Sequence, residues 1–156
     1  MTTPSAPGAA LKTIHGGALS RTEIAAMAAE KQPMRLLNCN LDEVDLSNLD
    51  MTGWCFEGCI LKRTNFTGAT LDDAAFASCR GAFVDFTAAK LVEATIEKCD
   101  FNNGKFGGAT VTQASFVGCK LTGADFTRAR AHAVLFKETT LSAAYLPGFS
   151  FHKVKI

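Results

Sequence analysis

Cysteine is the residue type whose spacing first suggests chemistry in this chain. Five of the six cysteines recur every 20 residues, and such a series of thiols can bind a metal ion or carry redox chemistry: Cys39, Cys59, Cys79, Cys99 and Cys119. A single-file column of thiols cannot surround Zn²⁺ tetrahedrally, however. The competing interpretation is that each cysteine is a small buried hydrophobic side chain. We favour the second interpretation and expect neither a metal nor any other cofactor.

Two histidines share the same spacing. His132 and His152 lie 20 residues apart and are expected to point outward. Two exposed imidazoles without a third ligand are more often ordinary surface residues than a metal site. The 20-residue spacing of the cysteines and histidines is therefore better explained by a structural repeat than by a chemical site.

A five-residue period governs most of the chain. Stepping by five through 36–156 visits 25 positions, and all except Gly81 and Ala131 are Leu, Phe, Ile, Met or Val. Two residues before each lies a second position, which over 59–144 is always Ala, Cys, Val, Thr or Gly. A period of five fits neither the 3.6 residues of a helical turn nor the alternation of a strand. We expect each unit to be a short extended piece and a bend, with one large and one small side chain inside.

The cysteine spacing indicates how many units close one coil. If every unit forms one side of a square, four units make a coil of 20 residues, and the five cysteines stack on one side. A triangular coil of three units would scatter them over different sides. Successive coils are expected to stack at the strand spacing of ~4.8 Å. The repeat therefore predicts an all-β fold, a solenoid of about six coils over 34–156.

The repeating units resemble those of a known family. The pattern A(D/N)LxX of the pentapeptide-repeat family, with a central Leu or Phe, is similar to LDEVDLSN, TNFTGATLDD, CKLTGADFTRA and TTLSAAYLPG. This resemblance covers about 36–156 and implies a right-handed quadrilateral parallel β-helix. The Qnr-type quinolone-resistance branch of that family is more loosely similar to LLNCNLDEVDLSN, CFEGCILKRTNFTGA and FVGCKLTGADFTRA.

Residues 19–33 carry the signals of a short N-terminal capping helix. Ser20 is placed as the N-cap, and Glu23 three positions later completes a capping box. We expect the helix to run over 21–31 and to end before Pro33. It would cover the first coil, whose terminal edge otherwise exposes unpaired backbone groups.

Residues 1–18, MTTPSAPGAALKTIHGGA, are expected to form a disordered tail because they are rich in Ala, Gly, Pro and Thr. They contain no apolar run typical of a signal peptide. No stretch of the chain reaches the ~18 apolar residues of a membrane span. The missing export signal favours reduced thiols. We therefore expect a cytoplasmic protein that makes no membrane contact.

The C-terminal end has no comparable helix. The small inward position there holds Phe149, which is too large for its slot. Unprotected sheet edges are usually covered, so we expect this apolar end to pair with its twin in a twofold homodimer. The alternative is a frayed monomeric end. The residues of the expected interface are Leu146, Phe149, Phe151, Val154 and Ile156.

Charge is uneven along the chain, although the formal net charge is only +1. Residues 39–73 hold seven carboxylates against Lys62 and Arg63, whereas 74–156 hold ten basic residues against six acidic ones. The seven carboxylates are a candidate surface for imitating DNA phosphates: Asp42, Glu43, Asp45, Asp50, Glu57, Asp72 and Asp73. A second candidate surface is a contact patch of Ile60 and Phe83, predicted to point outward on the same side.

Catalysis needs an acid, a base, a nucleophile or a metal in a concave site. A straight rod with regular faces offers none, so we expect no enzyme and no catalytic residue. Two binding functions remain. The family resemblance implies the first, in which the rod imitates duplex DNA, binds DNA gyrase or topoisomerase IV, and protects it from quinolones or related toxins. The alternative is a generic protein–protein interaction scaffold or an accessory of a larger bacterial assembly, which the neutral overall charge fits better. Neither involves direct nucleic-acid binding.

Overall fold

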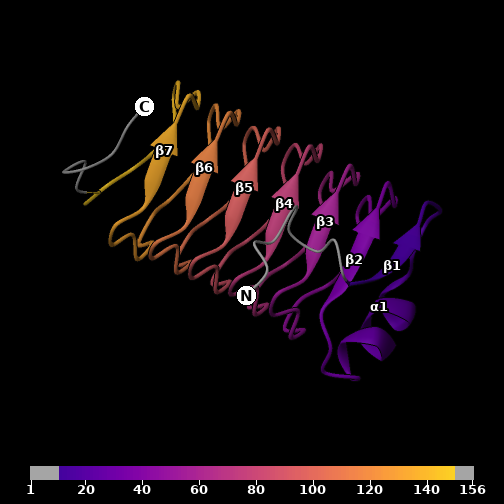
Figure 1. The fold of residues 1–156 in the computed structure, drawn as a ribbon. Coiled ribbons are helices and arrows are strands. Elements are labelled where there is room, and N and C mark those ends of the chain that lie inside the picture. Colours follow the sequence, from indigo (N-terminus) through magenta and orange to yellow (C-terminus); the bar gives the residue numbers. More distant parts are fainter. Residues whose placement is uncertain (1–10, 150–156) are drawn as a thin grey trace, which may run out of the picture.

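The computed structural model describes residues 11–149, which wind into a rod of stacked coils (Figure 1). Seven short strands and one helix are its regular elements. In chain order they are β1 (Lys12–His15), α1 (Arg21–Ala28), β2 (Met34–Leu37), β3 (Cys55–Glu57), β4 (Ala75–Ala77), β5 (Thr95–Glu97), β6 (Ser115–Val117) and β7 (Leu135–Lys137). The strands form one parallel sheet in the order β1 to β7. From β2 onward each strand pairs with the one 20 residues later.

Four ladders of parallel pairing give the rod four sides. Side 1 is the sheet of β1 to β7, and sides 2, 3 and 4 follow it along each coil through single bridges between residues 20 positions apart. The first bridges between successive full coils are Asn40–Ile60 on side 2, Asp45–Asn65 on side 3 and Asp50–Thr70 on side 4. The fold is therefore the predicted right-handed quadrilateral parallel β-helix of about six coils.

Each corner turns through a residue in the left-handed region of the backbone map. From Asn38 to Gly148, every fifth residue has a φ between 51° and 76°. Most corners that follow sides 2, 3 and 4 are closed by a backbone bond from residue i+3 to residue i, as when Val44 N–H donates to the Leu41 carbonyl at 3.0 Å. This bond and the neighbouring coils hold even the bulky Phe83 in a conformation that large residues seldom adopt.

Phenylalanine rings form two ladders inside the rod. On side 1 Phe56 stacks on Phe76, with ring centroids 4.7 Å apart. On side 3 Phe106 stacks on Phe126 at 4.5 Å. Rings of the two ladders meet edge to face, as Phe116 and Phe126 do at 86°. Both arrangements are favoured by the ring quadrupole. The large inward side chains are therefore committed to packing, and only the outside remains for binding.

Gly81 occupies a position that holds a large apolar residue in nearly every other unit, and its neighbour one coil later explains this exception. A Cβ at Gly81 would lie 2.7 Å from the ring of Phe101, so the ring occupies the space that a larger residue would need. The same ring lies edge-on to Phe76, with centroids 6.0 Å apart. A small residue in one coil is thus compensated by a large one in the next.

The N-terminal segment differs from the disordered tail expected over 1–18. Lys12–His15 form β1, which pairs with β2 and places Ile14 beside Leu36. The expectation of disorder is wrong for these residues, because an open sheet edge offers backbone partners even to a short segment with little apolar content. Residues 1–10 lie outside the described residues.

The helix α1 lies at the same end of the rod as β1 (Figure 1). The predicted capping box is confirmed: Glu23 N–H donates to Ser20 Oγ at 3.2 Å, and Ser20 N–H donates to Glu23 Oε1 at 2.9 Å. Ile24 is fully buried in the core. The helix ends at Ala28, earlier than the predicted residue 31, because the following residues turn and Lys31 adopts a φ of 60°.

Candidate functional site

The five regularly spaced cysteines form one buried column of free thiols at the start of side 2. Cys79 Sγ donates to the carbonyl of Phe56, one coil earlier, at 3.2 Å. Cys59 and Cys119 form the equivalent bonds at the same distance. The hydroxyl of Thr139 continues the column with a bond of 2.9 Å. The sulfur atoms are therefore hydrogen-bonding groups as well as small apolar ones.

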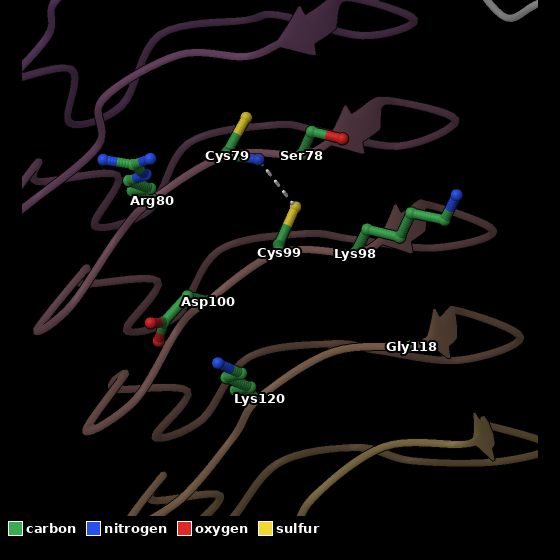
Figure 2. A pocket seen from close by; sticks show the side chains of 8 residues that line it. All are labelled: Ser78, Cys79, Arg80, Lys98, Cys99, Asp100, Gly118 and Lys120. Atoms are coloured by element: carbon green, nitrogen blue, oxygen red, sulfur yellow. Dashed lines mark hydrogen bonds between the residues drawn. The ribbon is translucent and has the colours of Figure 1, made fainter.

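The column also accepts backbone N–H groups that have lost their usual partner. In the described coils, the corners after β2 to β7 lack the backbone bond from residue i+3 to residue i that most other corners have. Cys79 N–H instead donates to Cys99 Sγ at 3.4 Å (Figure 2). Cys119 N–H donates in the same way to Thr139 Oγ1 at 3.2 Å. The column is thus a chain of hydrogen bonds along the corner, which gives cysteine a structural role.

Burial disfavours the reactive form of two thiols in the column, Cys39 and Cys119. It raises the pKa of Cys119 to about 11, and it is also the main reason that the pKa of Cys39 is raised. The thiolate is the reactive form of cysteine. At neutral pH the thiols of Cys39 and Cys119 are therefore protonated, a form that favours neither metal binding nor thiol exchange.

The seven candidate acidic residues do not share one face of the rod. Asp42 lies on side 2, Glu43 at the next corner, Asp45 on side 3, Asp50 and Asp72 on side 4, Asp73 at the corner after it, and Glu57 on side 1. They encircle the first coils. A partner that approaches from any single direction meets only some of them.

Three of these carboxylates are paired with cations of the N-terminal segment. The pairs are Arg21–Asp45 at 3.5 Å, Lys31–Asp50 at 3.7 Å and Arg35–Glu57 at 2.6 Å. All three cations precede residue 39, so a charge count over 39–73 omits them. When they are included, the seven carboxylates face five cations instead of two, and the local balance changes from −5 to −2.

Asp45 and Asp50 also fix the backbone. Asp45 Oδ1 accepts the N–H of Ser47 at 2.9 Å, and Asp50 Oδ1 accepts the hydroxyl of Thr52 at 2.6 Å. The hydrogen bonds from Ser47 and Thr52 hold the pKa of both carboxyls below the usual value. Asn65 makes the same turn bond without a charge. Asp at this position therefore has a turn-forming role that is independent of any resemblance to phosphate.

The candidate contact patch lies on side 2. Ile60 is 42% exposed and pairs with Arg80 in the ladder, whereas Phe83 is 45% exposed and lies at the far corner of the same side. The guanidinium of Arg63 lies over the Phe83 ring, 5.2 Å from its centroid. A cation in this position is attracted by the face of the ring.

Sequence reasoning missed a group of charged residues, most of them basic, on this same side. Arg80, Asp100 and Lys120 follow one another on successive coils (Figure 2). Together with Lys98 they line a hollow of about 290 Å³. A charge count along the chain cannot find the group, because Arg80, Asp100 and Lys120 are 20 residues apart. Sorting the charged residues by their place in the coil would have found it.

The residues expected at the dimer interface are described only in part. Leu146 and Phe149 are half-buried, and the Phe149 ring packs across the end of the core, 5.3 Å from Phe126 and 6.1 Å from Phe136. Phe149 therefore covers the last rings of the two ladders. The other three residues of the expected interface, Phe151, Val154 and Ile156, lie outside the described residues.

The two histidines considered as metal ligands do not form a site among the described residues. His132 is exposed, and His152 lies outside the described residues. Within 11–149 there is no group of three or more His, Cys, Asp or Glu side chains arranged to hold a metal ion. No helix in that range is long and apolar enough to cross a bilayer.

Comparison with family models gives two matches. A model described as a pentapeptide repeat region matches residues 49–126, and a model of eight copies of the pentapeptide repeat matches residues 34–63. Comparison with curated protein sequences gives no significant match.

Solved structures with similar folds include a trypsin-treated R167E form of QnrB1, a plasmid-mediated fluoroquinolone resistance protein. It is 21% identical, with 93% of this chain and 78% of that chain covered and a TM-score of 0.51. A pentapeptide repeat protein from the thylakoid lumen of Arabidopsis thaliana is 23% identical, with 74% and 70% covered and a TM-score of 0.43. HetL of the cyanobacterium Nostoc, involved in heterocyst differentiation regulation, is 14% identical, with 91% and 86% covered and a TM-score of 0.40. At 21% identity the similarity to QnrB1 concerns the fold alone.

Proposed function

Because the chain belongs to the pentapeptide-repeat family, we propose that it is a non-enzymatic scaffold that binds a protein partner on the outside of its rod. Its inward residues are used for packing, and its outward residues form flat ladders. The observation that carries the proposal is the exposed Phe83 ring under the guanidinium of Arg63, on the same side as exposed Ile60. Phe and the other aromatic residues, together with Arg, are enriched in the buried core of protein–protein interfaces.

A substitution at Phe83 tests this proposal. Phe83→Asn removes the ring but keeps a residue suited to the left-handed corner, where Asn103 already lies one coil later. The matched control is Gln113→Asn, at an exposed corner after side 4 with a φ of 58°. We expect Phe83→Asn to lose a partner that the wild type and the control both capture from lysate of the source organism, as measured by quantitative mass spectrometry. Identical capture by all three proteins would refute a role for Phe83.

The second candidate function is protection of DNA gyrase or topoisomerase IV by imitation of duplex DNA. Its support is the ring of carboxylates around the first coils, Asp42, Glu43, Asp45, Asp50, Glu57, Asp72 and Asp73. The cations paired with Asp45, Asp50 and Glu57 weaken it, because duplex DNA carries one negative charge per ~1.7 Å of its axis. A gyrase supercoiling assay with and without ciprofloxacin tests it. Neither inhibition nor rescue at micromolar protein would eliminate this candidate.

Further expectations complete the proposal. We expect the partner to be met in the cytoplasm, with support from the five free and buried cysteines of the column on side 2, since reducing compartments keep thiols reduced. We expect no direct binding to nucleic acid or membrane. We also expect a homodimer formed through the C-terminal end, where Leu146 and Phe149 remain only half-buried.

A further inference from the structure

We infer that side 2 is a binding surface for an acidic, extended segment of a partner protein. This inference rests on the proposed function, because it names the kind of partner that the scaffold would bind. Four observations carry it: the charge of this side compared with the opposite one, the lack of internal ion pairs, the flanking apolar groups and the carboxylate at its centre.

Side 2 is strongly basic over four successive coils. With the corner residues at both ends included, its segments are 58–63, 78–83, 98–103 and 118–123. They contain five cations and a single carboxylate, Asp100. The cations are Lys62, Arg63, Arg80, Lys98 and Lys120.

The opposite side shows that this excess is local. Side 4 of the same coils comprises 68–73, 88–93, 108–113 and 128–133. These segments contain three cations and three carboxylates, so that side is neutral. The basic excess is confined to these four coils of side 2, since Asp42 and Glu43 lie in the coil before them and Glu138 in the coil after them. It does not follow from the overall net charge of +1.

The five cations of side 2 are exposed, and none of them forms an ion pair with another residue in 11–149. The cations near the capping helix behave differently: Arg21, Lys31 and Arg35 each pair with a carboxylate of the solenoid. The cations of this side outnumber its one carboxylate, so its net positive charge attracts a ligand of opposite charge.

The size and composition of the surface fit a polypeptide. The cations extend over four coils, a length of about 14 Å at the strand spacing, which exceeds a single small anion and matches an extended segment of about four residues. Exposed Ile60 and Phe83 flank the charges and offer contacts to apolar side chains. A peptide can supply carboxylates and apolar groups together.

Asp100 favours a peptide over a nucleic acid. It lies between Arg80 and Lys120 in one ladder, so the charges there alternate in sign at strand spacing (Figure 2). A phosphate backbone has uniform charge and would be repelled at Asp100. A peptide can place a neutral or basic residue there and carboxylates on either side.

Two double variants with the same change in charge test the inference. Arg80→Glu with Lys120→Glu reverses two charges on side 2, and Lys90→Glu with Arg130→Glu does the same on side 4. All four residues occupy the equivalent ladder position, and each pair lies two coils apart. The probe is a fluorescein-labelled peptide of Glu and Ser with one Phe, measured by fluorescence anisotropy. A peptide with Gln in place of Glu and an oligo(dT) of matching charge are the comparison probes.

We expect the side 2 variant to bind the acidic peptide about tenfold more weakly than the wild type, and the side 4 variant to change by less than about twofold. Equal weakening in both variants, or equal binding of the Gln peptide, would overturn the inference. Tighter binding of oligo(dT), lost in the side 2 variant, would instead identify a nucleic-acid surface. If the peptide does not bind while Phe83→Asn still loses its partner, the acidic-partner inference fails and the proposed function stands.

Discussion

The cysteine column shows how a single side chain can hold two coils together. Cys99 Sγ accepts the N–H of Cys79, which has no carbonyl partner at its corner. Thr139 does the same for Cys119 with a hydroxyl, so the position requires a side chain that can accept a hydrogen bond. The cysteines on side 2 are therefore better compared with threonine than with alanine.

Substitution of Cys99 tests this role. Cys99→Ala leaves the buried N–H of Cys79 without an acceptor and is expected to lower the free energy of unfolding by about 1–3 kcal/mol. Cys99→Thr keeps an acceptor, as Thr139 does, and is expected to cost less. Urea denaturation of the three proteins measures the difference. If alanine proves as stable as threonine, cysteine is only a filler of volume at this position.

The sequence predicts which side chains are inside, because side-chain size recurs at a fixed spacing. It does not predict their hydrogen bonds, since the small position reports size alone, and Cys99 and Ala109 satisfy it equally. The ring of Phe101 fills the space beside Gly81, which depends on side-chain direction rather than spacing. The pairing of Arg21 with Asp45 was also missed, because the cation comes from outside the repeat.

At the level of secondary structure, the N-terminal end contains a strand, β1, that the sequence did not predict and a helix, α1, that it did. Ile14 of β1 pairs with Leu36, at a separation of 22 residues, so the five-residue step that begins at Leu36 does not reach it. That shift, and the presence of only four residues in β1, hid the strand from sequence analysis. The helix α1 was predictable because its capping box is a local signal.

The capping box is expected to stabilise the whole solenoid, since α1 buries Ile24 in the same core. Ser20→Ala removes the side chain that accepts from Glu23 N–H and should lower the free energy of unfolding by about 1 kcal/mol. Thr22→Ala, in the exposed first turn of the same helix, is the control and should have little effect. Thermal or urea denaturation followed by circular dichroism distinguishes them. Equal effects of the two changes would show that the cap itself contributes nothing.

The rod over residues 11–149 has two unlike ends. The first is covered by β1 and α1, whereas near the other Phe149 packs over Phe126 and Phe136. The proposed dimer would join two such C-terminal ends, and light scattering coupled to size exclusion at micromolar concentration measures the mass. We expect twice the 16.6 kDa of one chain. Phe149→Ser is expected to shift the population toward the monomer, and a monomeric wild type would refute the dimer.

The four-sided coil also determines how such a chain can change in length. An insertion of 20 residues in the middle would add one complete coil, and every residue beyond it would stay on the same side of the rod. An insertion of five residues would keep all inward side chains inward, but every later residue would move to the next side of the rod. If these five residues were inserted between Arg80 and Lys120, Lys120 would move to an adjacent side and the basic surface of side 2 would be divided. An insertion of any multiple of five residues therefore preserves the buried core, whereas only a multiple of 20 preserves a continuous surface along one side of the rod.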